Sequence, residues 1–181
     1  VSRQDDMIVL AVNKPRGIVC TEEKREKNSI VRFLDYPVRV TYAGRLDKDS
    51  RGLLLMTNNG DIIDRMMRGA NRHEKEYKVT VDKEITEEFL KKMSEGVPIL
   101  DTVTRPCRVS RIGKYTFSIV LTQGLNRQIR RMCEALGYEV KDLVRVRVMN
   151  IRLGSLKEGQ YRKLSDEELE ELYDLLNKGG R

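Results

Sequence analysis

The chain has no tryptophan, three phenylalanines, one histidine and three cysteines among its 181 residues. The cysteines, Cys20, Cys107 and Cys133, are odd in number and far apart, and no C-x-x-C pair occurs. A disulfide framework and a zinc cluster are therefore not expected, and this cysteine usage favours a reducing cytoplasm. Because His73 is the single histidine, two-histidine nuclease chemistry and multi-histidine metal sites are excluded within this chain.

Long hydrophobic runs are also missing. No apolar run approaches the roughly 20 residues of a membrane-spanning helix, and no signal peptide opens the chain, so we expect no membrane partner. The chain begins with Val1 rather than Met, which indicates a fragment or a processed product. Hydrophobic residues still make up 39% of the chain. That fraction supports a core of Leu, Val, Ile and Met, so general disorder is not expected.

Positive charge prevails, with 35 Lys and Arg against 28 Asp and Glu and a formal net charge of +7. Such an excess favours a polyanionic partner, although by itself it says nothing about the fold. The excess is concentrated in residues 127–152, which carry seven bases and three acids, whereas residues 165–181 carry six acids and two bases. We therefore expect a polyanion to contact the first of these segments and not the last helix.

Apolar periodicity predicts an α+β domain with an antiparallel or mixed sheet, because many strands are interrupted by few helices. Arg145 and Arg147 alternate with valines in the last long strand and are expected on its polar face. The predicted strands cover residues 7–15, 19–21, 39–43, 53–57, 75–81, 115–121 and 144–148. The predicted helices begin near residues 28, 62, 86, 127 and 166.

The segment 44–52, GRLDKDSRG, has the most unusual local composition. It places the carboxylate of Asp47 on a polar loop between two expected strands, where a rigid scaffold can present it to a cleft. Arg45, Lys48 and Arg51 surround that carboxylate with positive charge, which keeps it ionised and also attracts phosphate. A solvated turn with an ion pair explains the same pattern, so both interpretations stay open.

The same loop has the D-x-D-x-x-G start of an EF-hand, with Asp47, Asp49 and Gly52 at the matching positions. Arg51 stands where a ligand oxygen is required, and Asn58 stands where the bidentate Glu belongs. No helix leads into the loop, so a calcium site is rejected.

A second basic motif, GLNRQIRR, occupies residues 124–131. Asn126 is expected to cap a helix on which Arg127, Arg130 and Arg131 share one face. The free backbone N–H groups of a helix start and the forks of arginine suit phosphate and carboxylate groups. A basic face exposed to solvent is the alternative.

The third feature is Tyr77, in the alternating segment 75–81. An aromatic ring beside basic residues can stack on an unpaired base. A tyrosine on a strand face also serves as part of the core, which is the alternative here. His73 is expected at the surface or in contact with RNA rather than in a catalytic role.

Four ordered segments together resemble the pseudouridine synthases. The similarity is to the branch that acts on ribosomal RNA, the RsuA, RluB, RluE and RluF group, and it runs from about residue 7 to residue 175. Three stretches, HEKEYKVTVDKEITEEF, GVPILDTVT and GLNRQIRRMCE, look most like the RluF members. The four segments are NKPRGIVCT (13–21), YAGRLDKDSRGLLLMTNNGD (42–61), HEKEYKVTV (73–81) and QGLNRQIRRMCEALGYEV (123–140).

This resemblance implies the pseudouridine synthase fold, a mixed, mainly antiparallel sheet in two lobes flanked by helices, with a central RNA-binding cleft. Residues 1–181 would form one catalytic domain, without the small N-terminal RNA-binding domain that members of the branch usually carry. The implied activity is isomerisation of a specific uridine of 23S ribosomal RNA to pseudouridine, after the base has been flipped out of the RNA. No cofactor and no metal are implied.

The resemblance also implies residue roles. Asp47 matches the catalytic aspartate, Tyr77 matches the tyrosine that lies against the target base, and Arg130 matches the arginine that pairs with the aspartate. The expected partner is a stem-loop of large-subunit ribosomal RNA, with transfer RNA as a second candidate, bound by a cytoplasmic monomer. Further expected RNA contacts are Lys14, Arg16, Arg45, Lys48, Arg51, Arg72, His73, Asn126, Arg127 and Arg131.

Two other functions fit the residues without the resemblance. A non-catalytic RNA-binding domain would use the arginine helix and a Tyr77 platform, and it would not need Asp47. A metal-dependent nuclease would use Asp47, Asp49 and Asp61, and it would require magnesium and cleave the strand. The resemblance favours the isomerase over both.

Overall fold

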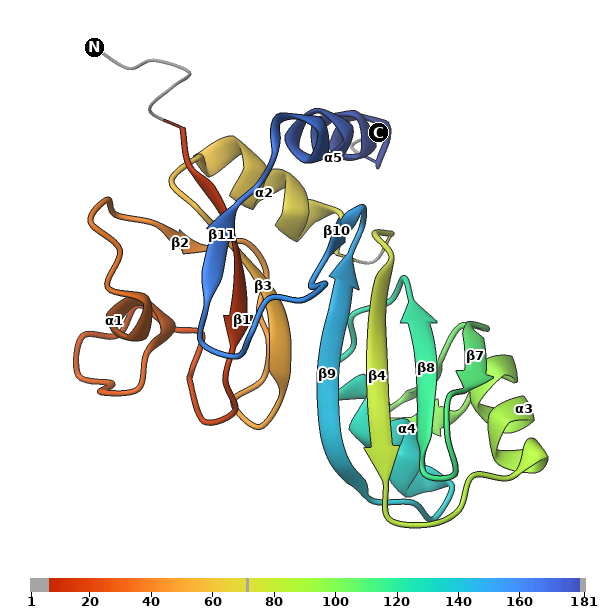
Figure 1. Cartoon of the computed structure of the whole chain (residues 1–181). Helices are drawn as coiled ribbons and strands as arrows, with labels where there is room; N and C mark the ends of the chain where they lie inside the picture. Colours follow the sequence, from red (N-terminus) through yellow and green to blue (C-terminus); the bar gives the residue numbers. More distant parts are fainter. Residues whose placement is uncertain (1–6, 71, 180–181) are drawn as a thin grey trace.

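The computed structural model describes residues 7–70 and 72–179 (Figure 1). All its strands except β5 and β6 belong to one nine-stranded sheet with the main order β11-β1-β3-β9-β4-β8-β7. Its neighbouring strands are antiparallel apart from the β3–β9 pair, which confirms a mixed, mainly antiparallel α+β fold. The elements are β1 (Val9–Lys14), α1 (Ile30–Leu34), β2 (Thr41–Tyr42), β3 (Arg51–Thr57), α2 (Gly60–Arg68), β4 (Lys75–Val81), α3 (Glu87–Glu95), β5 (Pro98–Ile99), β6 (Thr102–Val103), β7 (Arg108–Arg111), β8 (Thr116–Leu121), α4 (Gln128–Ala135), β9 (Val140–Val148), β10 (Ile151–Arg152), β11 (Tyr161–Lys163) and α5 (Asp166–Gly179).

The sheet divides into two lobes where β3 meets β9 (Figure 1). The first lobe contains β1, β2, β3 and β11 with helices α1, α2 and α5. The second lobe contains β4, β7, β8 and β9 with helices α3 and α4. The two strands at the junction pair at only two positions, Arg51 with Val144 and Gly52 with Arg145. A Cβ atom on Gly52 would lie 2.3 Å from the carbonyl oxygen of Arg145, and φ of Gly52 is +115°, so this approach of two backbones requires glycine.

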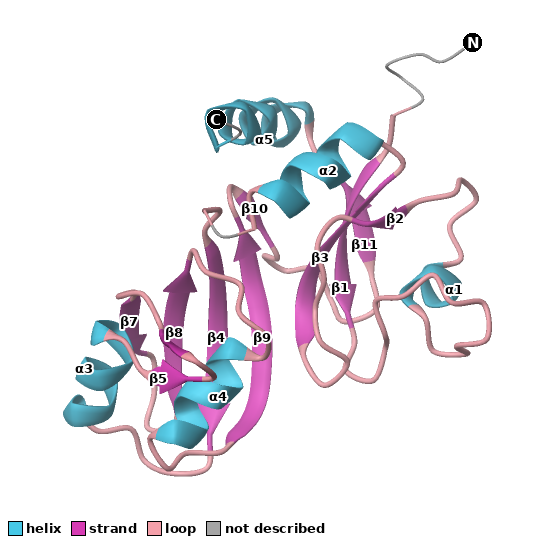
Figure 2. Cartoon of the chain, turned by 180° about the vertical axis from the view of Figure 1, so that it is seen from behind, coloured by secondary structure: helices cyan, strands magenta, loops and turns pink. Residues whose placement is uncertain are grey.

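Both lobes have apolar cores, and the core of the first lobe also takes in Val144 and Val148 of β9 across the junction. In the first lobe, β1 and β3 are covered on both faces, by α2 with α5 on one side and by the α1 region on the other. Burial on both faces explains why the sequences of these two strands are apolar throughout. In the second lobe, α4 lies across one face of the sheet (Figure 2), where Met132 and Cys133 pack against Phe117 and Ile119 of β8.

Side chains cap four helices, at Ser29, Thr86 and Ser165 as the sequence predicts and at Asn59, which the sequence indicates only as part of a turn. The side chains of Ser29, Asn59 and Thr86 accept hydrogen bonds from backbone N–H groups at the starts of α1, α2 and α3. At the start of α5, Ser165 N donates to the Glu168 carboxylate and Glu168 N donates to the Ser165 hydroxyl. This reciprocal pair is the capping box expected from the spacing.

Three local expectations are wrong. Arg127 and not Asn126 is the N-cap of α4; its φ of 48° is left-handed, and no side chain caps the helix. The Asn126 carboxamide oxygen instead accepts a hydrogen bond from Arg131. Residues 19–21 form no strand, because Val19 makes only an isolated bridge to Ser29. The strand expected over 39–43 is limited to β2.

Candidate active site

Asp47 lies on the loop between β2 and β3, and backbone hydrogen bonds fix that loop around it. Ser50 N donates to the Asp47 carbonyl over 3.0 Å, and Gly17 N donates to the Lys48 carbonyl over 2.7 Å. Leu46 is buried in the first lobe, at 7% exposure. The Asp47 side chain, by contrast, remains 44% exposed. The sequence therefore folds locally with an apolar anchor directly before an available carboxylate.

Lys14 supports this loop from below the surface. Its side chain is fully buried, and its ammonium donates to the carbonyls of Pro15 at 3.0 Å and Ile18 at 2.7 Å. Burial lowers the pKa of Lys14 to about 8. The expectation that Lys14 contacts RNA is corrected here, because a side chain inside the protein has no surface to offer. It holds the turn whose Gly17 binds the Asp47 loop.

Two arginines of the second lobe reach the loop from the start of α4. Arg127 forms a fork on Asp49, with distances of 3.1 and 2.7 Å, and its Nη1 lies 3.7 Å from Asp47 Oδ2. This fork holds the pKa of the Asp49 carboxyl below its usual value. Arg130 Nη2 donates to the Asp49 carbonyl at 2.8 Å and to the Ser50 hydroxyl at 3.3 Å. These contacts join the two lobes directly beside Asp47.

The expected pairing of Arg130 with Asp47 is not what the structure contains. Arg130 contacts the loop through Asp49 and Ser50, and its Nε lies 3.6 Å from Asp49 Oδ2 without a hydrogen bond. Among the ion pairs of the described residues, Asp47 is paired with Arg127. The two arginines differ in position, since Arg130 lies one turn further into α4 and is 15% exposed, against 39% for Arg127.

A pocket of about 560 Å³ opens between the lobes beside Asp47. Its acidic lining residues are Asp47 and Glu22, and Glu22 is already bonded to Arg39 and Thr41. Its basic lining residues outnumber them, and apolar and aromatic side chains complete the wall. Such a lining suits a ligand that combines a ring with phosphate. The basic residues are Arg45, Lys75, Arg127, Arg130 and Arg145, and the aromatic ones are Tyr42 and Tyr77.

Tyr77 occupies the pocket wall on β4 and is half-buried. The same ring packs against the apolar clusters of both lobes. The two interpretations of Tyr77, as a core residue and as a platform for a base, are therefore compatible. A ring that is supported from behind and open in front provides a stacking surface that needs little ordering when a base arrives.

The sequence analysis missed two pocket residues, Lys75 and Arg145. Lys75 precedes Tyr77 by two positions in β4, so it faces the same pocket, and burial lowers its pKa to about 8. Its position relative to Tyr77 is the signal that could have found it. Arg145 was expected on the polar face of its strand, opposite the valines, but it is 4% exposed. Alternation separates the two faces of a strand without indicating which face is covered, so no sequence signal marks its burial.

The other expected RNA contacts fall into three groups. His73 is corrected, because it is 5% exposed and packs against Gly69. Arg16, Arg51, Asn126 and Arg131 reach the surface but are occupied within the protein. Arg16 and Arg51 bind Asp142, and Arg131 binds Asn126. The remaining three, Arg45, Lys48 and Arg72, are exposed.

Neither a metal cluster nor a membrane-spanning helix occurs in residues 7–70 and 72–179. No group of three or more His, Cys, Asp or Glu residues is placed there to hold a metal ion. Asp61, the third acid of the nuclease hypothesis, is paired with Arg65 on α2. Within the same residues no helix has both the length and the apolar character needed to cross a membrane.

Comparison with known sequences identifies relatives over most of the chain. The model of the RNA pseudouridylate synthase family matches residues 8–135. The dual-specificity RNA pseudouridine synthase RluF of Escherichia coli K12 is 54% identical over 172 residues, which cover 95% of this chain and 59% of that protein. The ribosomal small subunit pseudouridine synthase A of Haemophilus influenzae is 33% identical over 89% of this chain and 72% of that protein.

Comparison with solved structures agrees. A crystal structure of a pseudouridylate synthase superimposes with a TM-score of 0.82 at 31% identity, over 92% of this chain and 74% of that one. The expected fold is therefore confirmed. The chain spans 59% of the length of the RluF relative that it matches.

Proposed function

Because the chain belongs to the RNA pseudouridylate synthase family, we propose that it isomerises a specific uridine of 23S ribosomal RNA to pseudouridine. The observation that carries this proposal is the Asp47 carboxylate, exposed at the edge of a cation-rich pocket and 3.7 Å from Arg127. A pocket of this size accepts one flipped nucleotide, and its arginines attract the flanking phosphates.

In the proposed reaction the bond between N1 of uracil and the sugar breaks, the base turns, and C5 bonds to the sugar. The proton on C5 is lost and N1 gains one, so the reaction needs no redox partner and no group donor. Asp47 starts the bond breakage. Three versions of this step fit the carboxylate, namely attack on the sugar, attack on the ring, and removal of a sugar proton.

Tyr77 and the basic residues take supporting roles in this proposal. Tyr77 stacks on the turned base. Extruding a base from structured RNA costs a few kcal/mol, which contacts between arginines and phosphates offset. Arg45 and Lys48 are exposed on the loop beside Asp47 and are placed to bind the backbone next to the target. Arg127 supplies the positive charge beside Asp47.

The names of the relatives point to more than one RNA substrate. The names of the relatives include a dual-specificity enzyme and a small-subunit enzyme, so three substrates are compared: 23S ribosomal RNA, 16S ribosomal RNA and transfer RNA. A stem-loop of 23S ribosomal RNA is our first choice, bound by a monomer in the bacterial cytoplasm where ribosomes are assembled.

The test is release of tritium from uridine labelled at C5, measured in the three transcripts without added metal. We expect release from 23S RNA by the wild-type chain and none by Asp47→Asn, with RNA binding retained by both. Release at the wild-type rate from Asp47→Asn would refute the assignment. No release by the wild type with tight binding would favour the non-catalytic module, and magnesium-dependent cleavage would favour the nuclease.

A further inference from the structure

Arg145 is a buried charge in the middle of β9. Removing a guanidinium from water is costly unless its donors are bonded. Among the described residues its hydrogen bonds go to two backbone carbonyls and not to a carboxylate. Its Nε donates to the Leu53 carbonyl at 2.9 Å, and its Nη1 donates to the Arg45 carbonyl at 3.0 Å.

The two acceptors lie on either side of the Asp47 loop. Arg45 precedes Asp47 by two residues, and Leu53 belongs to β3, directly after the loop. One planar side chain therefore ties the entry of the loop to its exit. The backbone of Arg145 contributes as well, because it lies against Gly52, the last residue before Leu53.

The charge of Arg145 is not explained by packing alone. Its neighbours include two other cations, the buried Lys14 and the half-buried Lys75, and after desolvation the charge of Arg145 also contributes to the lowered pKa of both. Like charges in a small, poorly solvated volume repel one another. The chain therefore carries a local cost to stability here, which is typical of positions that serve a site rather than a core.

The loop has separate supports on the C-terminal side of Asp47. Gly17 holds the Lys48 carbonyl, and Arg130 holds the Asp49 carbonyl. On the N-terminal side, the bond from Arg145 to the Arg45 carbonyl is the corresponding support. Without it, the N-terminal side of the loop would lose this hydrogen bond and depend on the buried Leu46 side chain.

We propose that Arg145 is a positioning residue, which fixes the segment from Arg45 to Asp47 and thereby sets where the Asp47 carboxylate stands in the pocket. The effect on catalysis rests on the proposed function, whereas the fixing of the loop does not. Arg145 acts through the backbone, so its loss should reduce the rate of the chemical step more than the affinity for RNA.

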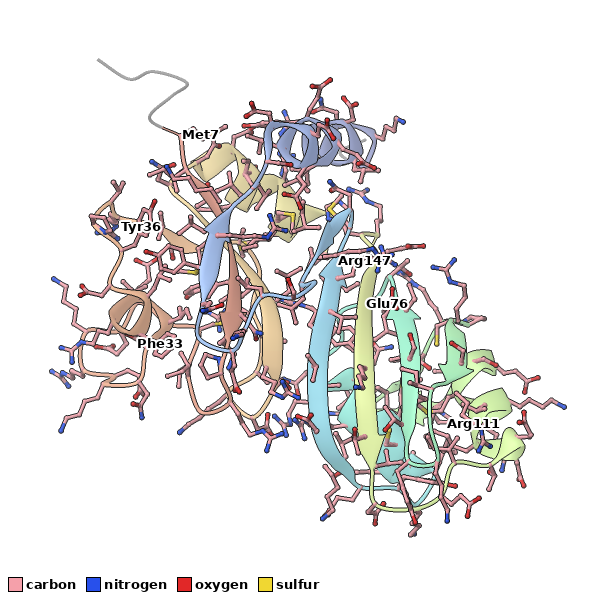
Figure 3. The ribbon with its side chains drawn as sticks, viewed as in Figure 1. Met7, Phe33, Tyr36, Glu76, Arg111 and Arg147 are labelled. Carbon is pink, nitrogen blue, oxygen red and sulfur yellow. The ribbon has the colours of Figure 1, made fainter. Side chains whose placement is uncertain are left out.

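The test variant is Arg145→Lys, and Arg147→Lys is its matched control. Arg147 lies two residues further along β9 with a side chain 11% exposed, and it also donates to a backbone carbonyl, that of Met149. Its other partners are the carboxylates of Glu74 and Glu76, and none of these three residues lines the pocket. Arg147 and Glu76 lie beside each other on β9 and β4 (Figure 3). Each substitution keeps one positive charge and removes the planar fork that reaches two acceptors.

The first measurement is the single-turnover rate of tritium release at saturating enzyme, together with the Kd for the same RNA. We expect Arg145→Lys to lower the rate about 100-fold, because a displacement near 1 Å at the reacting group has an effect of that size, with Kd changed less than about threefold. Arg147→Lys should leave both within about threefold. Equal rates in the two variants would overturn the proposal, and so would a loss confined to Kd.

The second measurement needs neither RNA nor activity. Amide hydrogen exchange of peptides covering residues 44–50 should be faster in Arg145→Lys than in the wild type and unchanged in Arg147→Lys. Unchanged exchange in Arg145→Lys would overturn the proposal. If the wild type converts no RNA, the proposed function fails while exchange still decides the anchoring of the loop.

A further variant distinguishes a loss of the fold from a loss of loop positioning. If Arg145→Lys does not fold, Arg145→Gln carries the same two measurements, since its amide donates to one carbonyl. Failure of both variants to fold, with Arg147→Lys folded, would show that Arg145 is required for the fold and would overturn the proposal.

Discussion

The first lobe is assembled from both ends of the described chain, whereas the second lobe is one continuous segment (Figure 1). In the first lobe β1 pairs with β11, and α2 packs against α5. In the second lobe β4 pairs with β8 and β9. The first lobe presents the acid, Asp47, and the second presents Arg127, Arg130 and Arg145. The candidate site therefore exists only while the two lobes are in contact.

The two lobes also hold their parts of the site differently. The Asp47 loop is held mainly through its backbone groups. Those bonds do not depend on which side chains the loop carries. The arginines of the second lobe act through their side chains, so one substitution removes one support. Substitutions at the junction and in each lobe therefore separate these contributions.

The largest effect is expected at the junction itself. Gly52→Ala would place a Cβ atom 2.3 Å from the Arg145 carbonyl at a φ of +115°, so the lobes must separate or the strand must twist. We expect a loss of about 4 kcal/mol in the free energy of unfolding, measured in urea. Gly60→Ala is the control, because no heavy atom lies within 4 Å of a Cβ at that helix position. Equal stability of the two variants would refute this picture of the junction.

Next in size is the contrast between the two arginines of α4. Arg130→Gln leaves the Asp49 carbonyl and the Ser50 hydroxyl without a buried donor. We expect the single-turnover rate to fall about 100-fold, equivalent to about 2.7 kcal/mol. Arg127→Gln removes an exposed fork and should lower the rate about tenfold. A larger loss in Arg127→Gln would show that the charge beside Asp47 outweighs the support of its loop.

Replacing Lys75 tests how much a poorly solvated charge lowers the free energy of unfolding. Its pKa is about 8 when folded, against an ordinary 10.5. Between these values the unfolded chain binds more protons, so wild-type stability rises with pH there, and below pH 8 the buried charge is a penalty. Lys75→Met should therefore raise the free energy of unfolding by about 2 kcal/mol at pH 7, with the gain disappearing near pH 10.

Urea unfolding of Lys75→Met at several pH values checks this expectation. Lys78→Met, on the exposed side of the same strand, is the control and should show no such pH dependence. A loss of stability at pH 7 in Lys75→Met would mean that the hydrogen bond from the lysine ammonium to the Ala70 carbonyl, at 3.3 Å, outweighs the cost of desolvating the charge.

The smallest effect is expected where α5 joins the first lobe. Arg162 forms a fork on Glu168 and holds the pKa of that carboxyl at about 2. Because the folded pKa is depressed, this stability is present above about pH 4.5 and is lost as the pH falls toward 2. Glu168→Gln should cost about 1 kcal/mol at pH 7, discounted for exposure of the arginine, and nothing near pH 2. Glu167→Gln, on the exposed side of α5, is the control for thermal unfolding.

Local features of the fold were predictable from the sequence, and long-range ones were not. Ser29 and Thr86 cap their helices as expected, because a cap depends on residues within one turn. The strands β7 and β11 were missed because both are short. The partner of β11 is β1, far away in the sequence, and the partner of β7 is β8, which has the clear apolar alternation that β7 lacks. The position of Asp47 on a loop was predictable from the polar run alone.

The contacts within the site depended on tertiary geometry. The left-handed backbone at Arg127 changes how α4 begins, and with it which arginine stands beside Asp47. Burial of Lys14, His73 and Arg145 follows from how the elements cover one another. Charge and spacing indicate that a residue can bind RNA, but they do not indicate whether it reaches the surface.

Because the first lobe is built from both ends of the described chain, it cannot be completed until late in synthesis. On the ribosome, β1 is made about 150 residues before β11, which at ~5–20 residues per second corresponds to roughly 7–30 s. During that interval one edge of an apolar strand has no partner, and such an edge is prone to pair with other chains. In the second lobe the interval between synthesis of paired strands is shorter, because its strands belong to one continuous segment. A newborn chain is therefore most in need of chaperone protection while its carboxyl end is still being synthesised.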